Sequence, residues 1–233
     1  MRRLTGSRWM VLGASPCAPD FCGIGVDVVA VAGASILLRQ PDIYCVAEMG
    51  GCYRYINEVR EMQAAGGKLI AHSTVVYWVD VRRVTPRPPW PYPDPYPADE
   101  VVGSGRLATA DKLGEWQQWQ PGDIVLSNSG LMALQIAIRD GAREVHLVGM
   151  EGYRGLGDDY FMADVRIPKD VKKPTGDQIR EWQTQYFRPL LDRIVGLCPE
   201  VDFVPYGTLR LNAIGVRVRA ARRFDTAEID GVQ

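Results

Sequence analysis

The chain has 233 residues, of which 46% are hydrophobic, and its 27 basic and 28 acidic residues give a net charge of −1. This length and composition predict one sizeable globular domain with a real core, and the balanced charge gives no reason to expect nucleic acid as a partner. The sequence contains no apolar run of about 18 residues, so we expect no membrane span and place the protein in the cytoplasm.

The five cysteines, Cys17, Cys22, Cys45, Cys52 and Cys198, are an odd number for a chain of this size. An odd count indicates reduced thiols rather than a disulfide framework. The spacings between the first four differ from the two-residue separation that is typical of zinc sites. We therefore expect no structural metal ion.

Short apolar runs in the first half of the chain predict buried strands at residues 8–12, 27–32, 43–47 and 68–72, with a further candidate at 75–81. Residues 54–65 have helical spacing and end at a pair of glycines, which predicts one helix. The links between the first three strands are too short for full helices.

A proline-rich excursion is expected at residues 85–100, where PRPPWPYPDPYP interleaves prolines with Trp90, Tyr92 and Tyr96. This proline density forbids a helix or a central strand and favours an extended path. Two interpretations stay open: a surface loop packed by its own aromatic rings, or a flap or docking edge near a site. A short helix is expected at residues 111–119.

The second half predicts a strand, a helix, a strand, a loop, a long helix and a last strand, at residues 123–126, 131–140, 144–148, 152–173, 175–195 and 202–205. Pro189 is expected to kink the long helix. The alternation of strands and helices predicts an α/β, Rossmann-like fold with a mostly parallel sheet and helices on both faces. We expect one domain over residues 1–210 and a basic tail over residues 211–233.

The stretch LSNSGLMALQIAIRDGAREVHLVGMEGY, residues 126–153, carries the strongest functional indication. A loop of small residues opens an apolar helix, and unpaired amides and the positive helix end at such a place attract a phosphate or a carboxylate. The polar cluster after the next strand is expected to face the same crevice, because ligands of parallel sheets bind beyond the carboxyl ends of the strands.

Three blocks resemble the bacterial sialyltransferase family typified by the Campylobacter lipooligosaccharide enzymes, and the wider Rossmann-like group that includes archaeal pterin pyrophosphokinases. The blocks are VLGASPCAPDF at residues 11–21, DVVAVAGASILLRQPDIYCVAE at 27–48 and NSGLMALQIAIRDGAREVHLVGMEGYRGLGDDYFMAD at 128–164. In that family the third block ends in an acidic residue and two tyrosines, and Glu151, Tyr153 and Tyr160 fill those places here.

The resemblance implies a CMP-type nucleotide-sugar donor lying across the ends of the strands. The residues that it places at the phosphate and the sugar are Gly13, Ala14, Ser15, Asn128, Ser129 and Gly130. The hydroxyls of Tyr153 and Tyr160 would hydrogen-bond the leaving phosphate, where fixed neutral donors stabilise developing charge. Glu151 would bind a ribose hydroxyl.

This chain departs from the family's pattern at three places. Ala14 and Ala32 stand where the family has asparagines, and the family's general-base histidine is missing from residues 169–179. Of the two histidines, His146 falls inside a predicted strand, where a core or sheet-face role is expected, and His72 ends a strand at the ligand edge. Asp159 is the candidate substitute base.

The leading hypothesis is a nucleotide-dependent transferase, most like a glycosyltransferase, with a small-molecule nucleotide as partner and no certain cofactor. A second enzyme hypothesis is pyrophosphoryl transfer to a small molecule, with Mg²⁺ held by Asp158, Asp159 and Asp164. A third is a degenerate, non-catalytic protein for nucleotide binding or assembly. Homo-oligomerisation is left open.

Overall fold

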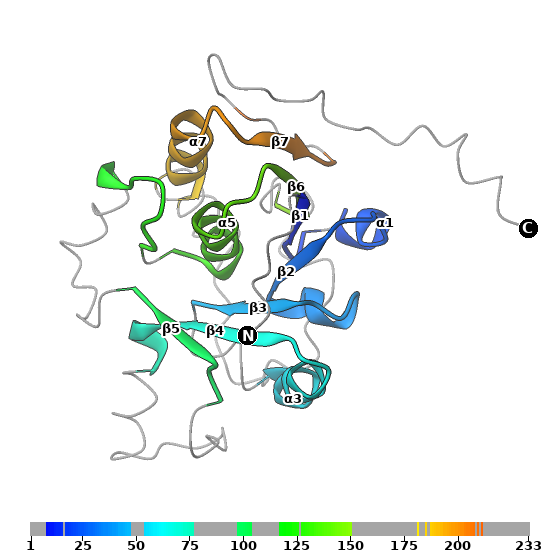
Figure 1. Cartoon of the computed structure of the whole chain (residues 1–233). Helices are drawn as coiled ribbons and strands as arrows, with labels where there is room; N and C mark the ends of the chain where they lie inside the picture. Colours follow the sequence, from blue (N-terminus) through cyan, green and yellow to red (C-terminus); the bar gives the residue numbers. More distant parts are fainter. Residues whose placement is uncertain are drawn as a thin grey trace, which may run out of the picture.

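The computed structural model describes residues 8–15, 17–47, 54–76, 97–103, 117–125, 127–150 and 187–207, together with residues 181, 185, 209 and 211. These residues form one seven-stranded sheet in the order β5-β4-β3-β2-β1-β6-β7, and every neighbouring pair runs parallel. Figure 1 shows this sheet between helices on its two faces. The predicted α/β, Rossmann-like fold is therefore confirmed.

The strands are short, and all except the edge strand β5 are mostly buried. Their bounds are β1 (Arg8–Leu12), β2 (Val28–Ala32), β3 (Ile43–Val46), β4 (Lys68–His72), β5 (Glu100–Val102), β6 (Glu144–Val148) and β7 (Asp202–Pro205). Every residue of β2 and β3 is buried. Strands covered on both faces have no solvent side, which is why they are continuous runs of apolar residues rather than alternating patterns.

The helical elements are α1 (Ala18–Phe21), the 3₁₀ helix η1 (Gly33–Leu37), α3 (Ile56–Ala64), α5 (Ser129–Arg139) and α7 (Arg188–Leu197). The first three pack on one face of the sheet, and α5 and α7 pack on the other. The links that follow β1 and β2 hold only α1 and η1, which confirms that they are too short for full helices.

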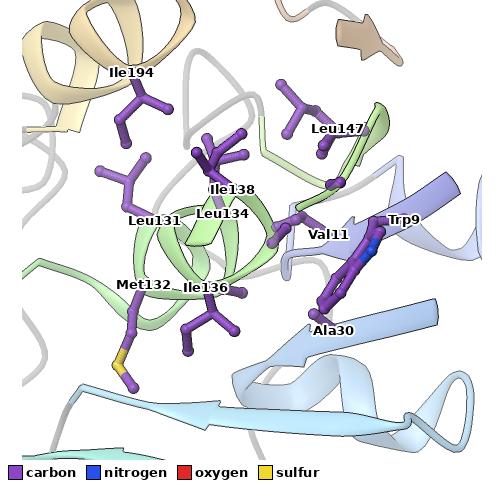
Figure 2. Close-up of a cluster of buried hydrophobic side chains, with 14 of the residues drawn as sticks. Trp9, Val11, Ala30, Leu131, Met132, Leu134, Ile136, Ile138, Leu147 and Ile194 are labelled. Atoms are coloured by element: carbon purple, nitrogen blue, oxygen red, sulfur yellow. The ribbon is translucent and has the colours of Figure 1, made fainter. Parts of the chain in front are cut away.

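Helix α5 is the centre of the larger core. It packs on β1, β2 and β3, and α7 lies against its other side. All residues from 129 to 138 are buried, so the helix is covered around its whole circumference, and most of these residues are apolar. Figure 2 shows Leu134 and Ile136 of α5 in one cluster with Trp9 and Val11 of β1. Each such side chain contributes about 1.5–3 kcal/mol when it is fully buried.

Three aspartates close the amino edge of the sheet. Each immediately precedes a strand, and its carboxylate accepts a hydrogen bond from a backbone amide of a neighbouring strand. The donor–acceptor pairs are Arg8 to Asp27 at 3.0 Å, Val29 to Asp42 at 2.8 Å and Leu69 to Asp99 at 2.8 Å. Because each bond joins the start of one strand to the start of the next, it fixes their relative register.

The fifth strand is not where the sequence predicts it. The sequence predicts a strand over residues 75–81, but Val75 and Val76 belong to a helical turn that begins at residue 73, and residues 77–81 lie outside the described part. The edge strand is instead β5, which pairs with the end of β4. It begins at Glu100, the last residue of the predicted proline-rich excursion. A strand of three residues directly after so many prolines gives no clear strand signal in the sequence.

Residues 123–125 are not a strand either. The backbone of Val125 is paired with the side chain of Gln135, which accepts from the Val125 amide at 2.8 Å and donates to its carbonyl oxygen at 3.3 Å. This segment lies on α5 rather than in the sheet. The side-chain amide supplies the two hydrogen bonds that a neighbouring strand would otherwise supply.

Pro189 lies in the first turn of α7; of the helix predicted over residues 175–195 with a kink at Pro189, residues 175–180, 182–184 and 186 lie outside the described part. Gln185 and Phe187 are π-helical, and the α-helix begins at Arg188. Proline lacks the N–H that would donate to the carbonyl four residues earlier, which explains the change of helix type here. Of the predicted helix over 111–119, only residues 117 and 118 are described as helical, in a 3₁₀ turn.

Several predicted segments lie outside the described residues: 85–96 of the excursion, the loop 152–173 and the tail from 212 onward. Within the described part, no helix combines the length and the apolar character that crossing a bilayer requires.

Two buried thiols predict a fall in stability at alkaline pH. Burial, aided by the Glu200 carboxylate, raises the pKa of Cys198 from 9.0 to about 11, and burial also raises the pKa of Cys45. Between pH 9.0 and about 11 the unfolded chain loses the Cys198 proton that the folded chain keeps, so the free energy of unfolding falls as the pH rises. Urea denaturation across this range should show a shallower decline in Cys198→Ala; an unchanged slope would contradict the assignment.

Candidate functional site

The carboxyl ends of β1 and β6 form the topological switch point of the sheet. The two strands are paired along their whole length, with Leu12 opposite Val148. From β1 the chain continues toward β2 on one side, and from β6 it continues toward β7 on the other. The loops therefore diverge above this pair, and in open parallel sheets ligands bind in the crevice at such a point.

Two glycines bring the loops after β1 and β6 into backbone contact. The Gly13 amide donates to the carbonyl of Val148 at 2.8 Å, and the Ser15 amide donates to the carbonyl of Gly149 at 3.1 Å. A Cβ on Gly13 would overlap the Gly149 carbonyl oxygen, and a Cβ on Gly149 would overlap the Gly13 carbonyl oxygen. Neither glycine can be replaced by a residue with a side chain, because the added Cβ would in each case meet a backbone carbonyl group of the other loop.

The start of α5 is tied down by side-chain hydrogen bonds. Asn128 is the N-cap residue, and its Oδ1 accepts from the Leu131 amide at 2.8 Å. Ser129 Oγ accepts from the amide of Ala47, the residue after β3, at 3.0 Å. The helix therefore begins at the same edge of the sheet at which β1 and β6 end.

Met150 fills the space between these segments. Its sulfur would lie 3.0 Å from a Cβ on Gly13 and 2.8 Å from a Cβ on Gly130. The residue is 3% exposed, so the base of the edge is apolar. Around it, Asn128 is exposed and Ala14 and Ala47 are half-buried. A ligand that approaches this edge from solvent would therefore contact Asn128, Ala14 and Ala47 before it reached Gly13 or Gly130.

The structure brings together the two predicted phosphate-contacting segments. Their residues are Gly13, Ala14, Ser15, Asn128, Ser129 and Gly130. Only Ala14 and Asn128 reach the surface to a substantial degree, because Ser15 is 2% exposed and Ser129 is 8% exposed. The other predicted site residues, Glu151, Tyr153, Asp159 and Tyr160, lie outside the described residues, as do Asp158 and Asp164.

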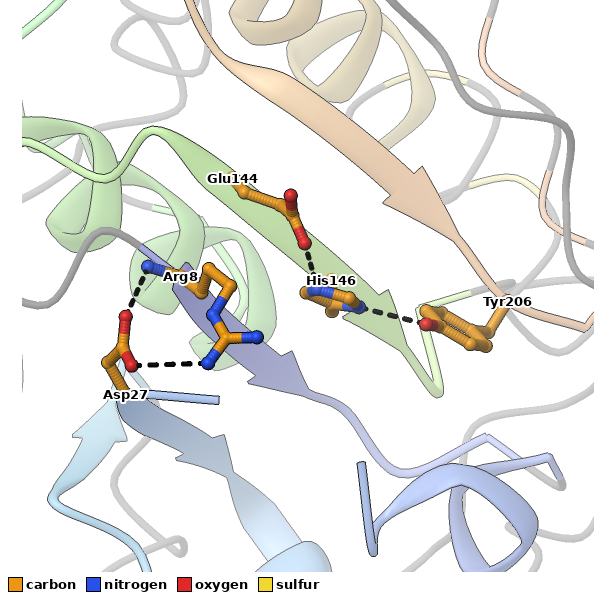
Figure 3. A network of polar contacts seen from close by, with 5 residues as sticks. All are labelled: Arg8, Asp27, Glu144, His146 and Tyr206. Carbon is orange, nitrogen blue, oxygen red and sulfur yellow. Dashed lines mark hydrogen bonds and ion pairs between the residues drawn. The ribbon is translucent and has the colours of Figure 1, made fainter. Parts of the chain in front are cut away.

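His146 has the interior role that its strand position predicts. In Figure 3 it lies on β6 between Glu144 and Tyr206. Its Nε2 is 2.7 Å from Glu144 Oε1, and its Nδ1 is 2.8 Å from the Tyr206 hydroxyl. His146 is 7% exposed and Tyr206 is 1% exposed. The three side chains join β6 to the end of β7 within the fold.

His72 lies at the ligand edge but far from the switch point. It ends β4, three strands from β1, or about 14 Å away at the usual strand spacing. Its Nδ1 accepts from the Thr74 amide at 3.2 Å, so a neutral ring carries its proton on Nε2. Nε2 lies against Gly103, where a side chain would overlap the ring. In this tautomer Nε2 is a donor and not a base.

The opposite end of α5 carries a cluster of charged side chains. Arg139, in the last turn, forms ion pairs of 2.7 Å with both Asp140 and Glu100. The hydrogen bond to Asp140, ahead of that to Glu100, raises the pKa of Arg139 above its ordinary value. A cation at this end complements the helix dipole. Within the described residues, no three metal-binding side chains of the His, Cys, Asp or Glu type cluster together.

Sequence reasoning missed two residues that shape this edge, Gln135 and Met150. Gln135 had a visible signal, since it is the one polar residue in the otherwise apolar stretch 131–138 of α5. Met150 had none, because a methionine after a buried strand is an ordinary feature of a core.

A scan against protein-family models, a search of curated proteins and a search of solved structures each found no match. The resemblance to the sialyltransferases therefore stays a prediction from the three sequence blocks.

The contact between the two glycines predicts contrasting effects of two alanine substitutions. Gly13→Ala should destabilise the protein by about 3 kcal/mol or more, because the new methyl group meets backbone that cannot rotate away. Gly23→Ala is the matched control, since nothing lies within 4 Å of its added Cβ. It should change stability by less than about 1 kcal/mol. Equal effects in chemical denaturation would show that the two loops are not in contact.

Proposed function

We propose that this protein binds a nucleotide-activated sugar at the carboxyl edge of its sheet and acts as a glycosyltransferase-like enzyme. One observation carries the proposal: the loop after β1, the start of α5 and the end of β6 meet above the switch point. Parallel α/β sheets bind phosphate-containing ligands at such a place.

The start of α5 supports an anionic ligand. Asn128 occupies the Leu131 amide, and no described residue accepts a hydrogen bond from the Ser129 amide. The helix is 11 residues long, so its dipole places partial positive charge at this end. Asn128 is exposed beside these amides and has a side-chain NH₂ group that can donate to a phosphate oxygen.

The position of Met150 refines where the phosphate would bind. The sulfur occupies the space between Gly13 and Gly130, so a phosphate cannot approach those two backbones directly. The proposal therefore places the phosphate on the outer side of Met150, within reach of Asn128 and Ala14. This position still lies beyond the ends of β1 and β6.

The proposed chemistry rests on residues that follow β6 in the sequence, from Glu151 onward, and that lie outside the described part. An acceptor hydroxyl attacks the anomeric carbon of the sugar, the bond from that carbon to the phosphate oxygen breaks, and the hydroxyl proton passes to a base, for which Asp159 is the candidate. Tyr153 and Tyr160 donate hydrogen bonds to the departing phosphate. Such donors are worth several kcal/mol in a site that excludes water, as an order of magnitude.

A thermal-shift screen with CMP, UDP, GDP and ATP, each with and without Mg²⁺, tests the proposal. CMP should stabilise the protein without the metal, by about 2.7 kcal/mol at a hundredfold excess over the dissociation constant. Stabilisation by ATP only in the presence of Mg²⁺ would favour the pyrophosphokinase hypothesis instead. No shift with any nucleotide would overturn the nucleotide-binding proposal.

Asn128 offers a substitution that separates ligand binding from helix capping. Asn128→Asp keeps an oxygen for the Leu131 amide, so stability should be preserved, but the added negative charge should weaken CMP binding. Asn128→Ala is the matched comparison, since it removes the cap and should cost about 1 kcal/mol of stability. Isothermal titration and chemical denaturation measure the two effects. Undiminished CMP affinity in Asn128→Asp would place the phosphate elsewhere.

A further inference from the structure

Gln135 is a buried polar side chain in the middle of an apolar helix. It is 0% exposed, and its neighbours in α5 from residue 131 to residue 138 are all apolar. Its amide makes three hydrogen bonds: Oε1 accepts from the Val125 amide at 2.8 Å, and Nε2 donates to the Val125 carbonyl at 3.3 Å and to Ser127 Oγ at 3.0 Å. All three partners belong to the segment that leads into α5.

That segment is held at two points. At its far end, Trp119 is fully buried, its indole N–H donates to the Asp123 carbonyl at 3.0 Å, and its own carbonyl accepts from Arg193 of α7 at 2.9 Å. At its near end, Gln135 binds Val125 and Ser127. Ser127 directly precedes Asn128, so the anchor at Gln135 lies next to the ligand edge.

An apolar side chain of similar size would fill the same volume in this core. Burying an amide instead is favourable only when its donors and acceptors are paired, because each unpaired group costs the free energy of its desolvation. Here the pairing is complete only when the Val125 backbone and the Ser127 hydroxyl lie where they do in this structure. Gln135 therefore selects one position of this segment, which leucine could not do.

We propose that Gln135 is a positioning residue for the proposed ligand site: it holds Val125 and Ser127 so that Asn128 is presented beside the first amides of α5. This inference rests on the proposed function, since it assigns Gln135 to the same site. Without the three hydrogen bonds the segment samples other positions. The apparent affinity for the ligand then falls in proportion to the fraction of molecules whose segment is in the binding-competent position.

The test compares Gln135→Leu with Ile138→Ala, a substitution on the same helix whose side chain is buried three residues further from the site. Both should lower the melting temperature. Only Gln135→Leu should speed hydrogen exchange of the amides from 125 to 131 and weaken CMP binding, by roughly tenfold if the competent position falls to a tenth of the population. Ser127→Ala, which removes one of the three bonds, should have an intermediate effect.

A double-substitution cycle with Asn128→Ala shows whether Gln135 acts through that residue. In the Asn128→Ala background, Gln135→Leu should weaken CMP binding by less than it does alone, while its effect on stability is retained. If the wild-type protein binds CMP and Gln135→Leu binds it equally well, the positioning role is overturned and the proposed function stands. If exchange at 125–131 rises equally in Ile138→Ala, the inference fails as well. Absence of CMP binding by the wild-type protein overturns both.

Discussion

The contact between Gly13 and Gly149 determines how the loops after β1 and β6 meet at the carboxyl edge of the sheet. Because neither residue carries a side chain, the loops after β1 and β6 lie backbone to backbone, with the Ser15 amide bonded to the Gly149 carbonyl. The Met150 side chain packs against both Gly13 and Gly130, so it lies between the loop after β1 and the start of α5. Ser35 reinforces the arrangement from the other face, since its hydroxyl donates to the Gly13 carbonyl at 2.6 Å.

The sequence predicts the buried strands well and the edges of the sheet poorly. Strands β1, β4, β6 and β7 have the predicted bounds, because strands covered on both faces are unbroken apolar runs between turn residues. Residues 123–125 look the same in sequence, yet they pair with Gln135 rather than with a strand. Composition reports that a segment is buried and extended, but the partner that satisfies its backbone is set by the tertiary structure. The edge strand β5 is short and half-exposed, so it carries little such signal.

The same limit applies to the site. The small-residue loop before a helix predicts a place for a phosphate, and the helix does begin there, with Asn128 as its cap. The glycines in these loops have a second explanation, since Gly13 and Gly130 make room for the Gly149 backbone and the Met150 side chain. Close packing and close approach of a ligand both require a missing side chain, so sequence alone cannot separate them. Asn128 is stronger evidence for a ligand site than either glycine. Its Oδ1 already accepts from the Leu131 amide, yet the residue is exposed at the carboxyl edge, where its NH₂ group can donate to a ligand.

Buried polar side chains hold the ligand edge from both faces of the sheet. On the face of α5, Gln135 and Ser129 bind backbone groups of the segments that flank the site. On the other face, His146 joins Glu144 to Tyr206, whose ring packs on Phe21 of α1 with centroids 4.9 Å apart. Helix α1 follows the loop at 13–15, so this network supports that loop at its far end. Apolar packing alone would tolerate small shifts of these loops, whereas hydrogen bonds to named backbone atoms do not, because each shift leaves a buried polar group unpaired. The fold thus combines an apolar interior, which supplies most of the stability, with a few buried polar contacts that determine where the edge lies.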